Sequence, residues 1–265
     1  MLRSEAEEAR SLDEFLNKVK RADGPFYRQV KKLVRKITSP KVNRLPGFLR
    51  PMFRFLYEMH FGAIMIWHTF WNIIYFYPLF QARCASIGRN VSIDRMPFVI
   101  GPVQIHIGDD VWLGGNIQIS SGRILKAPQL IIHDHAQINW SASIVVNREV
   151  VIEEYVRISW NCTITDSDGH PRQADLRAQN EPVNLRDIRP VRICKYAWIG
   201  NGSYILKGVT IGEGAVIGAN SVVISDVPPY SLALGNPAEV VIRNYGRPAK
   251  TNPAEGEYPL TDTRP

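Results

Sequence analysis

Aliphatic residues recur every six positions through most of the chain after residue 86, a spacing that fits neither a helix nor a strand. They form four blocks of three residues and one block of six. The members are Ile87, Ile93 and Val99; Ile107, Leu113 and Ile119; Ile132, Ile138 and Ile144; Ile152, Ile158 and Ile164; and Ile193, Ile199, Ile205, Ile211, Ile217 and Val223. The chain therefore contains an internal six-residue repeat.

A hexapeptide repeat predicts a parallel β-helix, in which three hexads form one triangular coil. The aliphatic residues would point inward, each contributing about 1.5–3 kcal/mol when fully buried. Small or β-branched residues follow most of them after four positions and suit the tight corners: Val111, Ala136, Ala142, Val156, Ala197, Ser203, Val209, Ala215 and Ser221. We expect a mainly β domain built from this repeat.

Extra residues interrupt the repeat in four places, between 99 and 107, 119 and 132, 144 and 152, and 164 and 193. Each interruption follows three hexads, which is one full coil. The insertions should therefore all leave from the same edge of the prism. The fold alone does not identify a function, so the chemistry has to come from these insertions and from residues outside the repeat.

The region before the repeat predicts an α-helical, aromatic-rich extension. Residues 1–22 have apolar positions at helical spacing, and a basic stretch follows over 28–54. Residues 59–82 contain no Asp, Glu, Lys or Arg, and 11 of the chain's 26 aromatic residues lie between Phe53 and Phe80. Polar residues and a proline interrupt this stretch, so we expect helices in the cytoplasmic membrane interface, or a re-entrant hairpin, with membrane contact through residues 28–80. The alternative is packing against the rest of the protein or a sister subunit.

The formal charge of +7 belongs entirely to the first 60 residues, which hold 14 Lys+Arg and 7 Asp+Glu. The remaining residues hold 18 of each sign. This distribution argues against a nucleic-acid partner, because such proteins usually carry basic charge over the folded surface. It favours an anionic membrane surface, and we expect a cytoplasmic protein at the inner face of the cytoplasmic membrane.

Cysteine usage and segment composition complete the domain prediction. Cys84, Cys162 and Cys194 form no close pair, which supports neither a disulfide framework nor a CxxC zinc site. We expect a basic and aromatic extension over 1–82 and a β-helix domain over 83–245 with a loop insertion over 166–190. The last segment, 246–265, contains four prolines and is expected to be a flexible tail.

The longest insertion contains the candidate catalytic residue, His170. A histidine held at the root of an excursion from a rigid coil suits a general base. By itself, a histidine in a loop is an ordinary feature. Asp166 and Asp168 would either orient the imidazole or serve as turn residues.

Further motifs surround this histidine and resemble a known family. They include Gly169-His170-Pro171 with Leu176-Arg177, Trp198-Ile199-Gly200, Asp226-Val227-Pro228-Pro229 and Gly235-Asn236-Pro237-Ala238. Over residues 130–243 the chain is similar to the galactoside, maltose and nodulation sugar O-acetyltransferases. The resemblance implies a left-handed β-helix, acetyl-CoA as the acyl donor, no metal, and a homotrimer with active sites between neighbouring subunits.

The resemblance also implies roles for individual residues. His170 corresponds to the family's catalytic base and Asn139 to an asparagine near the reacting centre. The residues expected to bind the acceptor are Asn147, Asp168, Arg177 and Trp198, and those expected to bind coenzyme A are Asn201, Gly202, Lys207, Ala219 and Arg243. Asn147 replaces a family carboxylate that binds the sugar, so a galactoside acceptor is not implied.

We therefore expect an acetyl-CoA-dependent O-acetyltransferase acting on a sugar of a cell-surface polysaccharide or its lipid-linked precursor. His170 would take the proton of the acceptor hydroxyl as it attacks the thioester. Two alternatives stay open. One is a zinc hydratase resembling the γ-class carbonic anhydrases, with ligands among His106, His133, His135 and His170, and the other is a non-catalytic β-helix scaffold.

Overall fold

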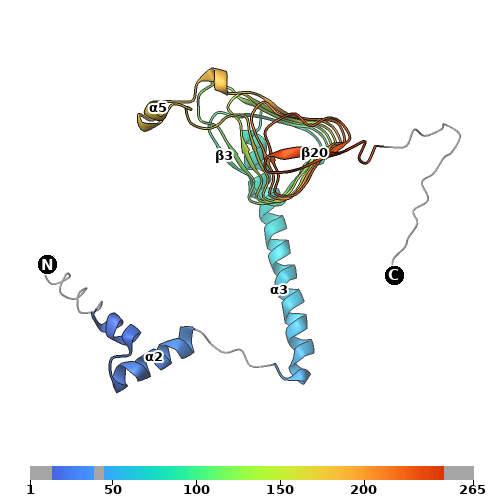
Figure 1. Ribbon diagram of the computed structural model, residues 1–265. Coiled ribbons are helices and arrows are strands. Elements are labelled where there is room, and N and C mark those ends of the chain that lie inside the picture. Colours follow the sequence, from blue (N-terminus) through green and yellow to red (C-terminus); the bar gives the residue numbers. More distant parts are fainter. Residues whose placement is uncertain (1–13, 39–44, 248–265) are drawn as a thin grey trace. The chain divides into compact units, whose positions relative to one another are not determined.

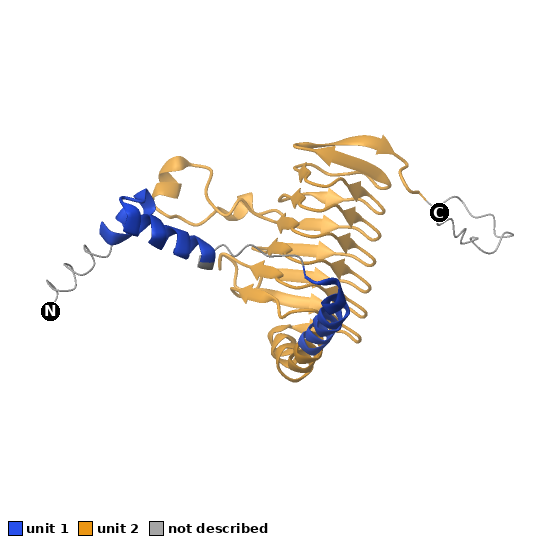
Figure 2. Cartoon of the chain, turned by 90° about the horizontal axis from the view of Figure 1, so that it is seen from below, with its two compact units in different colours: residues 1–64 blue, residues 65–265 orange. Residues whose placement is uncertain are grey.

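The computed structural model describes residues 14–38 and 45–247 (Figure 1). Contacts divide the chain into two compact units, residues 1–64 and residues 65–265 (Figure 2). Unit 2 contains three parallel sheets whose strands follow one another around a triangular prism, and Figure 2 shows the coils stacked one on the next. This architecture is a left-handed parallel β-helix, and it confirms the predicted fold class.

The three sheets, called A, B and C below, each take one strand from every coil, and sheet B also contains the terminal hairpin β19–β20. Sheet A contains β1 (Ser86–Ile87), β4 (Gln104–Ile107), β7 (Gln129–Ile132), β10 (Glu149–Ile152), β13 (Val191–Ile193) and β16 (Thr210–Ile211). Sheet B contains β2 (Ser92–Ile93), β5 (Trp112–Leu113), β8 (Gln137–Ile138), β11 (Arg157–Ile158), β14 (Trp198–Ile199), β17 (Val216–Ile217), β19 (Ser231–Gly235) and β20 (Ala238–Arg243). Sheet C contains β3 (Phe98–Ile100), β6 (Gln118–Ser120), β9 (Ser143–Val145), β12 (Thr163–Thr165), β15 (Tyr204–Ile205) and β18 (Val222–Val223).

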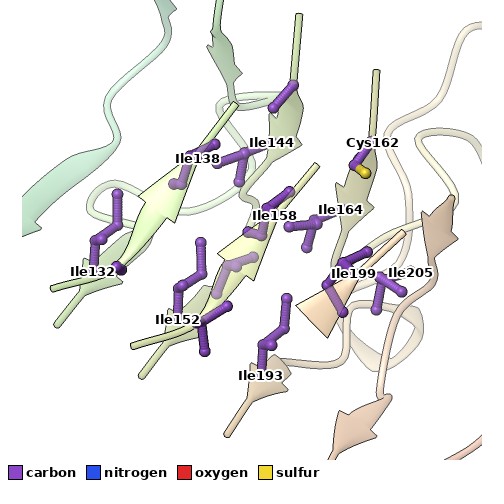
Figure 3. Packing of buried hydrophobic residues seen from close by; sticks show 14 of the residues in the cluster. Ile132, Ile138, Ile144, Ile152, Ile158, Cys162, Ile164, Ile193, Ile199 and Ile205 are labelled. Carbon is purple, nitrogen blue, oxygen red and sulfur yellow. The ribbon is translucent and has the colours of Figure 1, made fainter. Parts of the chain in front are cut away.

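The repeated aliphatic residues stack in register and fill the interior. In sheet A, Ile132 pairs with Ile152, which pairs with Ile193, and Figure 3 shows these side chains directed into the core. Every member of the repeat from Ile107 onward is at most 4% exposed. The three members of the first coil are only partly buried and pack against the core, because that coil has a neighbouring coil on one side only.

The corners of the prism use left-handed backbone three residues after the repeated aliphatics. Positive φ angles occur there at Asn90, Asp110, Asn116, His135, Ser141, Tyr155, Asn161, Tyr196, Gly202, Gly208, Gly214 and Asn220. Glycine and asparagine adopt this conformation readily, whereas other residues pay about 1–2 kcal/mol. The small residues predicted one position later are all buried, which confirms their corner role.

All four insertions connect a strand of sheet C to the next strand of sheet A, so they leave from one edge, called the insertion edge below. This confirms the expectation drawn from the spacing. The longest insertion contains α5 (Ala174–Ala178) and η3 (Leu185–Asp187) and extends from one corner of the prism (Figure 1). The edges between sheets A and B and between sheets B and C are called the A–B edge and the B–C edge.

Both ends of the β-helix are covered. At the first coil, α4 (Tyr77–Arg83) places Phe80 in the core with 1% exposure. The Arg83 guanidinium donates hydrogen bonds to the carbonyl oxygens of Val103 at 2.9 Å and Gly101 at 2.8 Å. At the last coil, β19 and β20 form an antiparallel hairpin that joins sheet B through β17.

The helical extension precedes α4. A helix covers residues 14–21, followed by α2 (Pro25–Thr38), η1 (Gly47–Leu49), α3 (Arg50–Trp71) and the π-helical η2 (Asn72–Phe76). The expected helix over 1–22 lies partly outside the described residues, as does nearly all of the expected tail over 246–265. The last helix before the β-helix, α4, ends at Arg83. The boundary between the two compact units lies earlier in the chain, inside α3.

The uncharged aromatic stretch has two different environments. In its second half, Asn72 donates from Nδ2 to the carbonyl oxygens of Ile93 and Asp94 at 3.2 and 3.0 Å, and Phe80 is buried, so this part contacts the first coil of the β-helix. By contrast, α3 has no buried residue. Among the residues that the structure describes, no helix has both the length and the hydropathy of a membrane span.

Candidate functional site

The root of the long insertion is anchored by Asp166, which is fully buried. Its carboxylate accepts hydrogen bonds from the backbone N–H groups of Asn147, Arg148 and Glu149 in the preceding coil, at 2.6–3.0 Å. Removal from water raises the pKa of the Asp166 carboxyl, and these hydrogen bonds oppose that rise. Of the two roles considered for Asp166, the geometry therefore supports the turn residue.

The next acidic residue, Asp168, fixes the insertion from the other side. Its Oδ2 lies 2.5 Å from Nζ of Lys207, whose side chain is 6% exposed. It also lies 3.6 Å from Nε of Arg172. The Asp168 carboxylate thus joins the insertion to the coil that follows it.

His170 follows these anchors directly. Gly169 adopts a φ of +75°, which turns the chain and is a conformation that glycine accepts without strain. The His170 side chain is exposed. Within the described residues its imidazole has no hydrogen bond or ion pair, so both ring nitrogens are accessible on a backbone that is held at its root.

Arg177 closes the turn after His170. Its Nη1 donates hydrogen bonds to the carbonyl oxygens of Pro171 at 3.0 Å and Arg172 at 2.6 Å. These hydrogen bonds give the spacing between Gly169 and Arg177 a local structural reason. The contacts hold the backbone next to His170.

Asn147 is 2% exposed and is bonded within the chain. Its Oδ1 accepts from the backbone N–H of Gly122 at 2.7 Å, and its Nδ2 donates to Oγ of Ser167 at 2.8 Å. The side chain therefore links three successive excursions on the insertion edge. Its predicted contact with the acceptor stays a prediction.

Asn139 and Trp198 occupy a different part of the prism. Asn139 follows β8 at the B–C edge, where its Nδ2 donates to the carbonyl oxygen of Ile158 at 3.1 Å. Trp198 lies on the outer face of sheet B, half exposed, with its Nε1 donating to Oγ of Ser159 at 3.1 Å. Within one chain, sheet C separates the edge that carries Asn139 from the edge that carries His170.

The five residues predicted to bind coenzyme A fall into separate groups. Asn201, Gly202 and Ala219 lie together at the B–C edge in adjacent coils, where the backbone N–H of Asn220 donates to the carbonyl oxygen of Asn201. Lys207 lies at the insertion edge and is buried against Asp168. Arg243 is exposed at the end of β20.

A cluster of tryptophans beside Asn139 was not predicted from the sequence. The Trp140 and Trp112 indole N–H groups donate to the two carboxylate oxygens of Asp94, at 3.0 and 3.2 Å. Trp140 also stacks on Trp160, with ring centroids 6.4 Å apart. The sequence contained a signal for this cluster, because Trp140 and Trp160 both lie two residues after an isoleucine of the repeat.

The cysteines behave as packing residues. Burial raises the pKa of Cys84 to about 11 and also raises the pKa of Cys162. The Cys162 thiol contacts the carbonyl oxygen of Gly200 at 3.2 Å. Over residues 14–38 and 45–247, no three His, Cys, Asp or Glu side chains gather closely enough to hold a metal ion.

The sequence and the fold both have known relatives. The family model "Bacterial transferase hexapeptide (six repeats)" matches residues 190–225. The galactoside O-acetyltransferase of Escherichia coli K12 is 33% identical over 150 residues, which are 57% of this chain and 69% of that enzyme. A Schizosaccharomyces pombe protein that carries the name of an acetyltransferase is 40% identical over 100 residues, which are 38% of this chain and 43% of that protein.

Among solved structures, a mutant of AntD, an N-acyltransferase from Bacillus cereus in complex with dTDP and coenzyme A, has a TM-score of 0.50. Its sequence identity is 20%, and the match covers 64% of this chain and 89% of that chain. At this identity the likeness concerns the fold alone. The match to the galactoside enzyme extends over more than two thirds of the length of that enzyme. These relatives do not favour the alternative function, a zinc hydratase. The chain belongs to the hexapeptide-repeat O-acetyltransferase family and is an acetyltransferase.

Proposed function

We propose that this protein transfers the acetyl group of acetyl-CoA to a hydroxyl group of a cell-surface glycan or its lipid-linked precursor, with His170 as the general base. The proposal rests on the exposure of the His170 side chain and on the fixed backbone around it. Its imidazole is exposed and unbonded within the described residues, while Asp166, Asp168 and Arg177 hold the backbone around it. A general base needs this combination of an accessible nitrogen and a fixed position.

The reaction is a direct transfer. A ring nitrogen of His170 takes the proton of the acceptor hydroxyl while the hydroxyl oxygen forms a bond to the thioester carbonyl carbon. The Asn139 amide donates a hydrogen bond to the oxyanion, a type of contact that lowers the barrier to acyl transfer. As the tetrahedral intermediate collapses, the carbon–sulfur bond breaks and the proton passes from the imidazolium to the thiolate of coenzyme A.

The proposed active site is assembled between copies of the chain. His170 and Asn139 stand on different edges of one prism, so they meet only if the insertion of one copy reaches the B–C edge of another. Closed cyclic assemblies bring such unlike surfaces together repeatedly. We therefore propose a homotrimer with three equivalent sites, in which the small residues Asn201, Gly202 and Ala219 border the coenzyme A groove.

The extension supports a membrane-bound acceptor. On α2, Lys32, Arg35 and Lys36 are exposed, and α3 exposes large apolar side chains such as Phe55 at 64% and Trp67 at 61%. Basic residues beside interfacial aromatics favour anionic lipid surfaces. We place the protein at the inner face of the cytoplasmic membrane, where a lipid-linked glycan would be available.

Thiol release from acetyl-CoA tests the catalytic proposal. With a panel of envelope glycans as acceptors, His170→Ala should lower the turnover of the wild type at least a hundredfold, the usual effect of losing a general base. His133→Ala is the matched control, because the His133 side chain is 43% exposed and lies on a coil of the β-helix, outside the long insertion. Equal turnover in the wild type and His170→Ala would refute the assignment.

A further inference from the structure

The A–B edge carries a column of stacked rings that the proposed reaction does not use. His135, Tyr155 and Tyr196 occupy equivalent corner positions in successive coils. The His135 and Tyr155 ring centroids lie 4.6 Å apart, and those of Tyr155 and Tyr196 lie 5.2 Å apart, with interplanar angles of 19° and 18°. The stacked faces stabilise the corner, and 46% of Tyr155 and 55% of Tyr196 remain exposed.

A groove of about 470 Å³ runs beside this column on the outer face of sheet B. The ring column forms one wall, and Gln137, Arg157 and Trp198 line the rest, with Asp110 at one end. Trp198 is 51% exposed. Because Trp198 is also a predicted acceptor residue, the groove adjoins the proposed active site.

The two charged side chains that line the groove, Asp110 and Arg157, have different surroundings. Asp110 is engaged at its corner, where Oδ1 accepts from Nδ2 of Asn90 at 3.1 Å and Oδ2 lies 3.8 Å from Nδ1 of His135. Arg157 projects from β11 and is exposed. Within the described residues its guanidinium has no hydrogen bond or ion pair. The groove therefore offers an unpaired cation among aromatic and amide groups.

We propose that this groove binds an acidic sugar residue of the acceptor glycan, with the sugar carboxylate on Arg157. The guanidinium fork matches a carboxylate in two parallel hydrogen bonds. Tyrosine and tryptophan offer an apolar ring with a polar handle, which suits a pyranose with its apolar C–H face and its hydroxyl edge. This inference rests on the proposed function and specifies its acceptor as an acidic glycan longer than one sugar.

Calorimetric titration of the full-length protein tests the groove, with trigalacturonic acid as the acidic probe and maltotriose as the neutral probe. The wild type should bind the acidic trisaccharide at least tenfold more tightly than maltotriose. Arg157→Gln should weaken binding of the acidic trisaccharide about tenfold, the usual effect of losing a hydrogen bond between charged groups. It should leave the urea unfolding midpoint unchanged, because the side chain has no partner among the described residues.

The matched control is Arg123→Gln, which removes an exposed arginine at the insertion edge and should bind both probes like the wild type. Three results would overturn the inference: equal affinity for the two trisaccharides, undiminished binding by Arg157→Gln, or tighter Arg157-dependent binding of UDP-glucose than of trigalacturonic acid. The last result would indicate a nucleotide diphosphate site.

The two proposals fail separately. If thiol release depends on His170 while acidic glycan binding does not depend on Arg157, only the groove assignment is wrong. If Arg157-dependent binding is measured and no glycan supports His170-dependent thiol release, only the catalytic assignment is wrong.

Discussion

The ammonium group of Lys207 lies 2.5 Å from the Asp168 carboxylate, and the lysine side chain is almost completely buried. The sequence suggested that Lys207 binds a phosphate of coenzyme A, as an exposed lysine would. The structure gives it an ion pair that joins the long insertion to the next coil, and its contact with coenzyme A stays a prediction. This pair depends on the path of the insertion, which the repeat does not determine.

Replacing Lys207 distinguishes the two roles. If the lysine positions the insertion, Lys207→Met should lower the turnover number about tenfold or more, because small displacements of a catalytic group are costly. It should leave the KM for acetyl-CoA within about twofold, since the lysine would not touch the donor. Steady-state thiol release gives both parameters. A large rise in KM with an unchanged turnover number would restore the phosphate role.

The candidate site shows which residue properties can be read from sequence. The motif from Gly169 to Arg177 led to His170, and the structure leaves its imidazole accessible. The partners of Asn147 and Arg177 were not foreseen, because they belong to excursions whose lengths differ from coil to coil. Contacts between such segments depend on the paths that the segments follow in three dimensions. No periodicity in the sequence predicts those paths.

At the scale of elements, the hexad spacing predicted the strands of the β-helix and the common edge of the insertions. The spacing suffices because each hexad supplies one side of the prism and stacks on its equivalent in the next coil. Packing of the aromatic stretch against the rest of the protein was left as an alternative, but Phe80 was not predicted as the residue that covers the first coil. Phe80 lies in an aromatic stretch that has no apolar periodicity. The sequence therefore does not distinguish the buried positions of this stretch from the exposed ones.

Phe80→Ala should therefore be strongly destabilising. Removing a fully buried phenylalanine usually costs about 3–5 kcal/mol through lost burial and the cavity that remains. Leu79→Ala is the control, since Leu79 on the same helix is 42% exposed and should cost much less. Urea unfolding of the two full-length variants measures the difference. Equal losses of stability would mean that α4 does not cover the core as described.

At the scale of the whole molecule, the +7 charge of the first 60 residues gives the extension its proposed role. The basic side chains of α2 and the exposed aromatic residues of α3 are two features that favour the membrane interface. The first coil of the β-helix is covered by a separate helix, α4. A freely diffusing sugar would give no reason for such an extension.

Liposome flotation of the full-length protein tests this role. Lys32→Glu/Arg35→Glu should weaken binding to vesicles rich in phosphatidylserine at least tenfold, because each basic residue near such a surface contributes about 1 kcal/mol. Arg123→Glu/Lys126→Glu makes the same charge change on the β-helix and should have little effect. The membrane proposal fails if both variants float like the wild type, or if the wild type does not float.

The shared active site is tested most directly by mixing two inactive variants. His170→Ala lacks the proposed base and Asn139→Ala lacks the proposed oxyanion donor, so each alone should release little thiol. If one copy supplies His170 and its neighbour supplies Asn139, trimers assembled from equal amounts of both variants should recover about a quarter of the wild-type rate, since that share of interfaces contains both intact residues. A mixture no more active than its components would contradict the shared active site.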